Sequence, residues 1–460
     1  MKLQLVFARK SSGQTVQDRN VPPVGILTLA EYLLASIPQL TVEVFDGSQL
    51  ADEKLIESLT GDVVGFSTWW TNYPNSISIA RKIKQLRPDT KVLFGGPHAS
   101  TLAKQILENE SDIDFVFTGD GEKSLKAFLE GVDERQIPGL CYRESGRICE
   151  NPPDYTVSLN SVPHVRVRSL ATPFDWKPTE ATPGHSYFAI SKFRGCFRTN
   201  RCEYCSIPVE STRSSTVENF WEQIEILYEE AGIDCFFETA DIFPVKTAKK
   251  IAEARPDKLK TVKTRFYLYP GMAKEEYIEH MIGMGTANVF YGVESLHYFE
   301  GNEFSSVGGN RTSANGYSTD SLLREFQILG DAGITVMPSM VLGLPGESQS
   351  RLKANLDFAK LLSELPHVRE MSISPVIPLP GSDFFKECLE TKAIASKYQS
   401  ATSNDLRKSS NIDFFLLSKL LIQHHAEVEY ERLLEMLMEF VEGADIPIAH
   451  WGEGSEVEAC

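Results

Sequence analysis

The residues best suited to chemistry are three cysteines, Cys196, Cys202 and Cys205, which lie close together in the segment CFRTNRCEYC. Three thiolates from one loop can bind three irons of a cubane cluster and leave the fourth iron open, as a catalytic cluster requires. Structural zinc is one alternative, but His185 and Cys235, the next candidate ligands, lack the paired spacing of zinc sites. Three unrelated core cysteines are the other alternative, although buried cysteines rarely cluster. The spacing therefore favours an iron–sulfur cluster.

Composition limits where this chemistry takes place. The 460 residues are too many for one ordinary core and predict two domains plus a small appendage. The formal net charge of −17, without a run of Lys or Arg, predicts no nucleic-acid partner. No apolar stretch is long enough for a membrane span and the first residues are not a signal sequence, so we expect a cytoplasmic protein. Reduced cysteines in that compartment favour metal ligation over disulfides.

Strand-like and helical runs alternate over residues 1–135. Repetition of strand and crossover helix predicts an α/β domain with a doubly wound, Rossmann-like parallel sheet. Residues 136–182 contain several prolines and a predicted hairpin, and we interpret them as a linker. Strands are predicted at residues 3–8, 40–45, 63–67, 91–94 and 115–118, helices at 24–35, 50–59, 76–85 and 101–109, and the hairpin at 140–143 and 147–149.

Unusual residues follow three of these strands, at the carboxyl edge where such sheets bind their ligands. Small residues would let a flat, bulky ligand approach the backbone, and two adjacent tryptophans would offer it an apolar surface. Each loop alone is explained equally well as a turn, whereas three together favour a ligand site. The candidates are Ser67, Thr68, Trp69 and Trp70 after the third strand, Gly95, Gly96, Pro97 and His98 after the fourth, and Thr118, Gly119, Asp120, Gly121 and Glu122 after the fifth.

A second alternation of strands and helices occupies residues 183–390. About six parallel strands, each followed by a helix, predict a partial barrel, and the cysteines directly follow its first strand, where such barrels place their chemistry. Residues 391–460 are predicted to form a small helical region with a disordered end, and a loop at 302–316 is a candidate cover for the barrel mouth. The expected strands are 187–191, 235–238, 264–268, 289–293, 334–341 and 370–375, and the expected helices include 217–231 and 413–441.

The remaining cysteines and histidines are expected to be structural. Cys141 and Cys149 flank the predicted hairpin, and a pair of thiols cannot hold a second cluster. His424 and His425 lie in the predicted tail helix and are expected to be solvated or core histidines, because a helix histidine is seldom a ligand.

The cysteine segment resembles the cluster motif of the radical S-adenosylmethionine (SAM) superfamily, in which an aromatic residue, here Tyr204, precedes the last cysteine. The family pattern is CxxxCxxC, and this chain departs from it with five residues between Cys196 and Cys202. The resemblance implies a [4Fe-4S] cluster held by Cys196, Cys202 and Cys205, since the longer spacing still permits three ligands and leaves the cluster geometry open.

Segments at the ends of later strands resemble the SAM-binding motifs of the same superfamily. The segment FFETADIF implies that Asp241 and, as a second candidate, Glu238 receive the SAM amino group. The segment YGVES implies contacts of Glu294 and Ser295 with the ribose and carboxylate. The segment VLGLPGE, which contains Val341 and Gly343, resembles the part that packs the adenine, and residues 374–382 resemble the end of the sixth strand.

The amino-terminal module resembles the cobalamin-binding domain that precedes the barrel in class B radical SAM methyltransferases. It lacks the DxHxxG signature of proteins that ligate cobalt through histidine, since Asp46 is followed by Gly47 and Ser48. The resemblance implies a lower cobalt face without a protein histidine, which Trp69 or Trp70 is a candidate to cover. The alternative is that one tryptophan simply packs under the sheet. His98 is then a candidate polar contact to the corrin or its tail.

The resemblance implies an enzyme that cleaves SAM to a 5'-deoxyadenosyl radical and methylates an unactivated carbon through methylcobalamin, with flavodoxin or ferredoxin as electron donor. The substrate is a small molecule or a peptide, and a secondary metabolite, a tetrapyrrole or a lipid precursor each remain open. Three alternatives also remain. The same cofactors can serve oxidative cyclisation or ring rearrangement, the corrinoid-like domain can be empty, or the protein can be a corrinoid or redox sensor without turnover.

Overall fold

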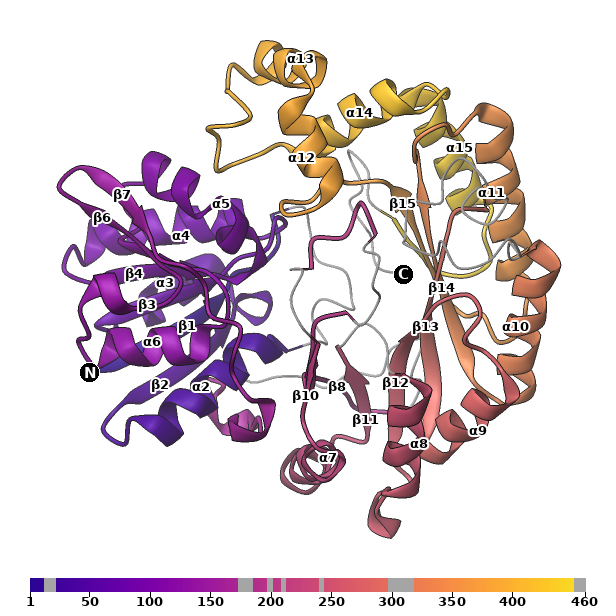
Figure 1. The fold of residues 1–460 in the computed structure, drawn as a ribbon, viewed down its shortest axis with the longest axis horizontal. Coiled ribbons are helices and arrows are strands. Elements are labelled where there is room, and N and C mark those ends of the chain that lie inside the picture. Colours follow the sequence, from indigo (N-terminus) through magenta and orange to yellow (C-terminus); the bar gives the residue numbers. More distant parts are fainter. Residues whose placement is uncertain are drawn as a thin grey trace.

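The computed structural model describes residues 1–11, 22–172, 185–196, 202–207, 212–239, 244–296 and 318–450. Figure 1 shows an amino-terminal α/β domain in indigo and magenta beside a second α/β domain, with the carboxyl-terminal helices in orange and yellow next to both. The predicted loop at 302–316, the predicted disordered end at 451–460 and Asp241 lie outside the described residues.

The first domain contains a seven-stranded sheet in the order β2-β1-β3-β4-β5-β6-β7, and the pairs from β2 to β5 are parallel. This order of parallel strands is a doubly wound arrangement, as predicted. The strand β1 is buried at four of its six positions because it lies inside the sheet and is covered on both faces. The strands are β1 (Lys2–Phe7), β2 (Thr41–Asp46), β3 (Val63–Ser67), β4 (Lys91–Gly95), β5 (Phe115–Phe117), β6 (Leu140–Glu144) and β7 (Arg147–Glu150), and the helices are α2 (Val24–Ser36), α3 (Asp52–Ser58), α4 (Tyr73–Leu86), α5 (Gly96–Asn109) and α6 (Gly121–Leu129).

The hairpin of β6 and β7 forms where it was predicted, but it is not part of a linker. β6 pairs antiparallel with β5, so that Val116 lies opposite Cys141 and Phe117 opposite Leu140. Leu140 and Cys141 are buried at this junction. The hairpin therefore extends the first sheet and covers an edge of β5 that would otherwise expose unpaired backbone groups.

At two of the strand ends, candidate residues lie in helices rather than in loops. α5 begins at Gly96, five residues before the predicted start, with a proline in its first turn. A proline is tolerated there because the first backbone N–H groups of a helix have no partner within the helix. Gly96, Pro97 and His98 therefore form the first turn of α5, and Gly121 and Glu122 likewise belong to α6. These residues were predicted to lie in loops, and this prediction is wrong.

The second domain is a half-barrel with strands in the order β16-β15-β14-β13-β12-β11-β8, all paired parallel. Its first six strands in sequence confirm the predicted partial barrel, and the short β16 adds an edge strand that was not predicted. The strands are β8 (Tyr187–Ile190), β11 (Cys235–Glu238), β12 (Lys263–Leu268), β13 (Thr286–Glu294), β14 (Thr335–Leu342), β15 (Met371–Pro375) and β16 (Ile448–Ala449), and the helices are α7 (Val217–Ala231), α8 (Val245–Glu253), α9 (Glu275–Met284), α10 (Thr319–Asp331) and α11 (Gln349–Ser363).

Alternation along β13 defines the two faces of the half-barrel. Tyr291 is fully buried and its ring lies 4.9 Å from that of Phe326 on α10, so it faces the helical layer. Phe290, Gly292 and Glu294 alternate with it and face the inside of the half-barrel. On that inner side the ring of Tyr267 lies 5.3 Å from that of Phe290. Aromatic packing therefore fills part of the interior below the strand ends.

The carboxyl-terminal region consists of α12 (Asp383–Glu390), α13 (Lys392–Thr402), α14 (Phe414–His425) and α15 (Tyr430–Glu442). The single helix predicted at 413–441 is thus two helices, separated at residues 426–429. The segment between α13 and α14 contacts the first domain, where the side-chain amide of Asn109 donates to the carbonyl of Lys408 at 2.6 Å. Figure 1 shows α12 and α13 on the side of α5. This region therefore connects the two α/β domains.

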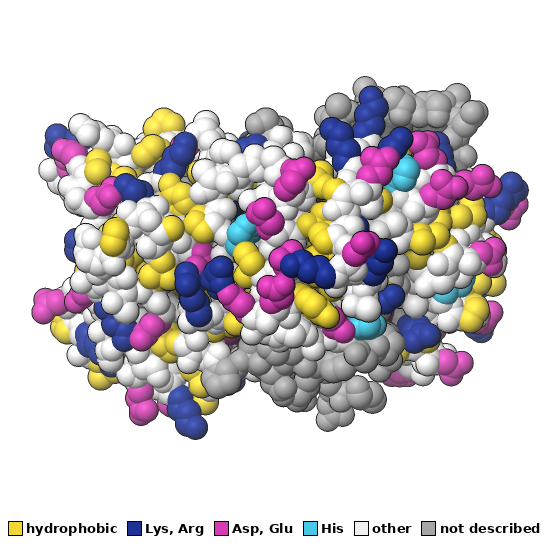
Figure 2. All heavy atoms as spheres, turned by 90° about the horizontal axis from the view of Figure 1, so that it is seen from below, with side chains coloured by type: hydrophobic (Ala, Val, Ile, Leu, Met, Phe, Trp, Pro, Cys, Tyr) yellow, Lys and Arg dark blue, Asp and Glu magenta, His cyan; other side chains and the backbone are white. Residues whose placement is uncertain are grey.

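No helix in the described part of the chain is long and apolar enough to cross a membrane. On the face shown in Figure 2, Lys and Arg side chains are interspersed with Asp and Glu side chains rather than gathered in one area. Short 3-10 helices complete the fold at η1 (Gly47–Gln49), η2 (Glu134–Gln136), η3 (Leu159–Ser161), η4 (Val167–Ser169) and η5 (Asp257–Leu259).

Candidate active site

A small two-stranded ribbon carries the cysteine segment. Its strands are β9 (Phe193–Arg194) and β10 (Arg213–Ser214), which pair antiparallel. Gly195 follows β9 with a φ of 82°, a backbone conformation that glycine adopts without strain, and Cys196 comes next. The ribbon holds the two ends of the cysteine segment together directly after β8, at the carboxyl edge of the half-barrel.

The three candidate ligands are half-buried, and their sulfurs are not in disulfides. The backbone N–H of Cys205 donates to the carbonyl of Cys202 at 2.9 Å, which forms a turn that brings these two residues together. The N–H of Phe384, at the start of α12, donates to the carbonyl of Glu203 at 3.1 Å and attaches the turn to the last strand-helix connection. Half-buried reduced thiols on a constrained loop fit a cluster that needs thiolate ligands and one accessible iron.

Tyr204 connects this turn to the end of β13. Its hydroxyl lies within hydrogen-bonding reach of the Glu294 carboxylate and of the Cys202 sulfur. Enclosure by protein atoms, with negative charge on Glu294 and Cys202 beside it, raises the pKa of Tyr204 well above its ordinary value. Glu294 itself has a φ of 64°, a strained conformation for a residue other than glycine. The resemblance singled out Tyr204 and Glu294 separately, and the structure brings them together.

Glu238 is held at the end of β11. Its carboxylate is buried and accepts the backbone N–H of Lys192 at 3.0 and 3.1 Å. Burial lowers the pKa of the Lys192 side chain to about 8. Glu238 thus fixes the backbone between β8 and the cysteine ribbon, a contact that sequence reasoning did not anticipate. Its partner candidate, Asp241, lies outside the described residues.

A buried polar network joins the ends of β13 and β14. Asn355 on α11 donates to the Ser295 hydroxyl at 3.0 Å and accepts the backbone N–H of Leu296 at 2.8 Å. The same Asn355 donates to Glu347, whose carboxylate also accepts the backbone N–H of Gly343. Sequence reasoning gave Glu347 no role and missed Asn355. Asn355 is a fully buried amide in the interior of a helix, and such a group needs hydrogen-bond partners. Its burial is known only from the tertiary structure, so the sequence contains no signal for this network.

Val341 lies near the end of β14 and is half-buried, whereas Met340 and Leu342 on either side of it are buried. The alternation places Val341 on the same face as Ser339, which lies opposite Gly292 of the neighbouring strand on the inner side of the half-barrel. The candidate SAM-binding residues Glu294, Ser295, Val341 and Gly343 are therefore neighbours at the ends of two adjacent strands.

The two tryptophans after β3 have different surroundings. Trp69 leaves 49% of its surface exposed, the largest exposure among the tryptophans of the described residues. Trp70 packs edge-on against Phe414 and Phe415 of α14, with ring centroids 5.6 and 5.9 Å away. Ser67 is half-buried, and Thr68 is buried and donates to the carbonyl of Gly95 at 2.8 Å. Trp69 is thus the tryptophan with surface to offer a ligand, and Trp70 is a packing residue.

His98, in the first turn of α5, is buried against the carboxyl-terminal region. Its Nε2 lies 3.0 Å from the carbonyl of Ser410, which makes Nε2 the protonated nitrogen, and its ring lies 4.1 Å from that of Tyr73. Burial lowers the pKa of His98 to about 4, although the Ser410 carbonyl acts in the opposite direction. The His98 imidazole is therefore neutral and joins the first domain to Ser410 of the carboxyl-terminal region.

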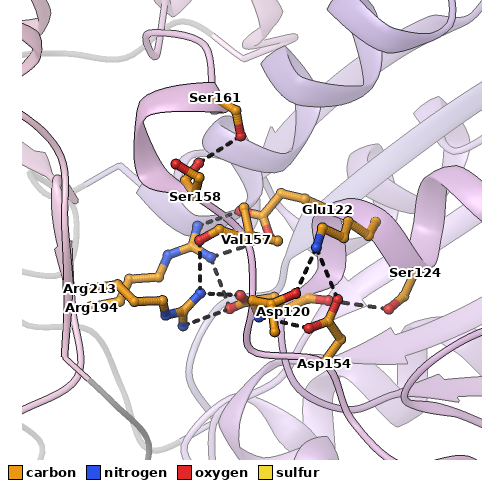
Figure 3. Close-up of polar contacts among 11 residues, drawn as sticks. Asp120, Glu122, Ser124, Asp154, Val157, Ser158, Ser161, Arg194 and Arg213 are labelled. Carbon is orange, nitrogen blue, oxygen red and sulfur yellow. Dashed lines mark hydrogen bonds and ion pairs between the residues drawn. The ribbon is translucent and has the colours of Figure 1, made fainter.

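The acidic residues after β5 form ion pairs with the cysteine ribbon, as Figure 3 shows. Arg194 of β9 contacts both acids, at 3.0 Å from Asp120 and 3.3 Å from Glu122. Arg213 of β10 also pairs with Asp120 and donates to the carbonyl of Val157 at 3.2 Å. Burial alone would lower the pKa of Arg194, but Glu122 and Asp120 raise it, so the guanidinium stays charged. These carboxylates attach the ribbon of β9 and β10, and with it the cysteine segment, to the first domain.

Glycines at the strand ends are explained by contacts within the protein. A Cβ on Gly96, whose φ is 89°, would come within 2.8 Å of the Thr68 backbone. A Cβ on Gly119 would come within 2.9 Å of Pro153. Thr118 donates to the carbonyl of Gly139 at 3.1 Å. The close approach that sequence reasoning assigned to a ligand is thus made by neighbouring protein atoms. Among the strand-end candidates, those that are not buried are Ser67, Trp69, Trp70, Gly95, Gly96, Pro97, Thr118, Gly119 and Gly121.

Comparisons with known proteins agree with this architecture. The family model of the B12 binding domain matches residues 17–129. An uncharacterized methyltransferase of Pyrococcus horikoshii is 23% identical over 92% of this chain and 95% of its own length. The anaerobic magnesium-protoporphyrin IX monomethyl ester cyclase of Rubrivivax gelatinosus is 22% identical over 84% of this chain and 70% of its own length.

Among solved structures, the radical SAM methyltransferase TsrM from Kitasatospora setae, with cobalamin and a [4Fe-4S] cluster bound, matches with a TM-score of 0.63. It is 19% identical, and the match covers 85% of this chain and 74% of TsrM, so the fold is shared across both domains. The chain thus contains a B12-binding domain, and its two α/β domains share the fold of TsrM.

Proposed function

We propose that this chain is a cobalamin-dependent radical SAM methyltransferase that transfers a methyl group to an unactivated carbon of a small molecule or a peptide. The observation that carries the proposal is the position of the cysteine segment. The ribbon before and after it is ion-paired to Asp120 and Glu122 of the B12-binding domain, while Tyr204 within it reaches Glu294 of the half-barrel. A thiol loop is thereby placed between the two domains.

The chain's own residues fit the cofactors of this chemistry. Cys196, Cys202 and Cys205 would hold a [4Fe-4S] cluster, and the exposed face of Trp69 would lie against cobalamin at the end of β3. When bound, the cluster supplies an electron for cleavage of SAM, and cobalamin carries a methyl group. An electron donor such as flavodoxin or ferredoxin would reduce the cluster.

The strand ends of the half-barrel would orient SAM. Glu294 and Ser295 are candidates for its ribose and carboxylate, Val341 and Gly343 for its adenine, and Asp241 or Glu238 for its amino group. Asn355 and Glu347 hold the strand ends that carry the ribose, carboxylate and adenine candidates, because their hydrogen bonds connect the end of β13 to the end of β14. Such buried supports matter because a misplaced reactant slows a reaction steeply.

The test uses the full chain, reconstituted without oxygen and supplied with hydroxocobalamin, SAM and a low-potential reductant. Bound iron, bound cobalt and 5'-deoxyadenosine are measured for the parent, for Cys205→Ala and for Cys149→Ala. Cys149 is a matched control, because it is also half-buried but lies in the hairpin of the first domain. We expect 5'-deoxyadenosine from the parent and from Cys149→Ala but not from Cys205→Ala. A parent that binds no iron would show that the proposal is wrong.

Cyclisation is the second candidate, and the match to the magnesium-protoporphyrin cyclase favours it. Both activities would use the same cofactors, so iron, cobalt and 5'-deoxyadenosine do not separate them. Transfer of a labelled methyl group does. The reconstituted protein is supplied with SAM that carries a deuterated methyl group, and the corrinoid is then extracted and analysed by mass spectrometry. A methyltransferase should yield corrinoid with a deuterated methyl group, whereas a cyclase should yield unlabelled corrinoid.

A further inference from the structure

Glu387, His424 and His425 form a cluster away from the cysteine segment. Glu387 lies in the last turn of α12, and the two histidines are the last residues of α14. One ligand atom from each residue lies within 4.8 Å of the other two. From the sequence, both histidines were expected to be structural because a helix histidine is seldom a ligand. Glu387 is distant from them in the sequence, and only the fold brings it to them.

The contact between His425 and Glu387 has the spacing of two ligands on one ion. The Nε2 of His425 lies 3.0 Å from a carboxylate oxygen of Glu387, but this Nε2 has no hydrogen-bond partner of acceptable geometry in the described part of the chain. Zinc bonds of about 2.0–2.1 Å at the tetrahedral angle separate neighbouring ligand atoms by roughly 3.3 Å. Two imidazoles and one carboxylate, with water at the fourth position, are a donor set that zinc accepts.

The electrostatic surroundings favour a cation. All three side chains lie in the last turns of their helices, where unpaired carbonyl groups give the helix end a partial negative charge.

We propose that Glu387, His424 and His425 bind a divalent transition metal ion, with Zn²⁺ as the occupant, and that the ion braces α12 against α14. The brace acts on the half-barrel as well, since the backbone N–H of Gly346 donates to the carbonyl of His425 at 2.8 Å. The same turn contains Glu347, whose carbonyl accepts the backbone N–H groups of Glu427 and Val428 at 2.9 and 3.1 Å. The site thus lies at the junction of the carboxyl-terminal helices with the end of β14.

The test measures zinc on the full chain carrying its cluster and cobalamin, after removal of any affinity tag. The parent is equilibrated with Zn²⁺ against a chromogenic chelator and compared with His424→Ala, Glu387→Gln and Glu390→Gln. His424 is exposed, so its replacement leaves the core intact, and Glu390 is an exposed glutamate of the same helix that serves as the matched control. Zinc, iron and cobalt are counted together on each sample.

We expect the parent and Glu390→Gln to hold one zinc per chain beyond any held by the cysteines, and His424→Ala and Glu387→Gln to bind it at least about tenfold more weakly. Zinc should also raise the unfolding temperature of the parent but not that of His424→Ala. Zinc binding that does not depend on His424 and Glu387 would overturn the proposal. Loss of iron or cobalt tests the proposed enzyme separately, because these metals would be held elsewhere.

Discussion

The segments that follow β3 and β5 begin at the same edge of the same sheet, yet they have different roles. After β3, Trp69 leaves about half of its surface exposed, 49%, at the edge where such folds bind ligands. After β5, Asp120 and Glu122 are buried and paired with Arg194 and Arg213 of the cysteine ribbon. The difference shows that position at a ligand-binding edge does not decide a residue's role. An acidic side chain there attracts a cation from the neighbouring domain, whereas an apolar ring does not.

The largest expected effect comes from breaking the ion pairs between Asp120 and the cysteine ribbon. Asp120→Asn leaves two mostly buried guanidinium groups with one carboxylate, and we expect the free energy of unfolding to fall by about 3–5 kcal/mol. Iron retention should fall with it, because both ends of the cysteine segment depend on this contact. Lys123→Met is the control, since it breaks a more exposed pair with Asp154 and an exposed hydrogen bond to Thr156, and it should cost less than about 1 kcal/mol. Chemical denaturation and iron analysis give the comparison, and equal losses in both variants would contradict it.

Trp70→Ala tests the packing role within the β3 loop. Loss of its contacts with Phe414 and Phe415 should reduce the free energy of unfolding by about 2–3 kcal/mol, somewhat less than for a fully buried tryptophan. Bound cobalt per chain should stay at the parent value once the protein is folded. Thermal unfolding and cobalt analysis on the same sample measure both. A cobalt loss without loss of stability would assign the ligand contact to Trp70 instead.

The His98 contact makes stability depend on pH. The folded protein lowers the pKa of His98 to about 4 from an ordinary 6.5, so between these values only the unfolded chain binds the proton. Stability should therefore fall as the pH drops below about 6.5, by about 2 kcal/mol between pH 7 and pH 5 from this group. His98→Gln keeps a donor for the Ser410 carbonyl but does not titrate. Its free energy of unfolding should therefore fall by about 2 kcal/mol less than that of the parent between pH 7 and pH 5. Identical slopes in the two proteins would argue that His98 is accessible to protons in the folded state.

The smallest effect on stability is expected at Trp69. Trp69→Ala should change the free energy of unfolding by less than about 0.5 kcal/mol, because half of the ring is in solvent. Cobalamin affinity should nevertheless fall, and Trp69→Phe should restore part of it through its aromatic face. Equilibrium dialysis with hydroxocobalamin measures both variants. An unchanged cobalamin affinity in Trp69→Ala would show that the loop after β3 has no ligand-binding role through this ring.

Strand and helix order could be read from the sequence because period and burial are local properties. The predicted strands at 63–67 and 235–238 and the predicted helix at 217–231 have the observed bounds. The start of α5 was missed because Gly96 and Pro97 resemble a turn, although proline is compatible with the first turn of a helix. The hairpin of β6 and β7 was recognised, but its pairing with β5 was not, since the sequence does not say which edge a hairpin joins.

The sequence by itself determined which residue types are present and where in each strand or helix they lie. It placed three thiols after the first strand of a half-barrel, acids and tryptophans at strand ends, and two histidines inside a predicted tail helix. Only the tertiary structure decided the partners: Arg194 and Arg213 for the acids, Phe414 and Phe415 for Trp70, Glu294 for Tyr204, and Glu387 for His425. The physical reason is that charge pairing, burial and metal ligation depend on distance in space, and these partners are far apart along the chain.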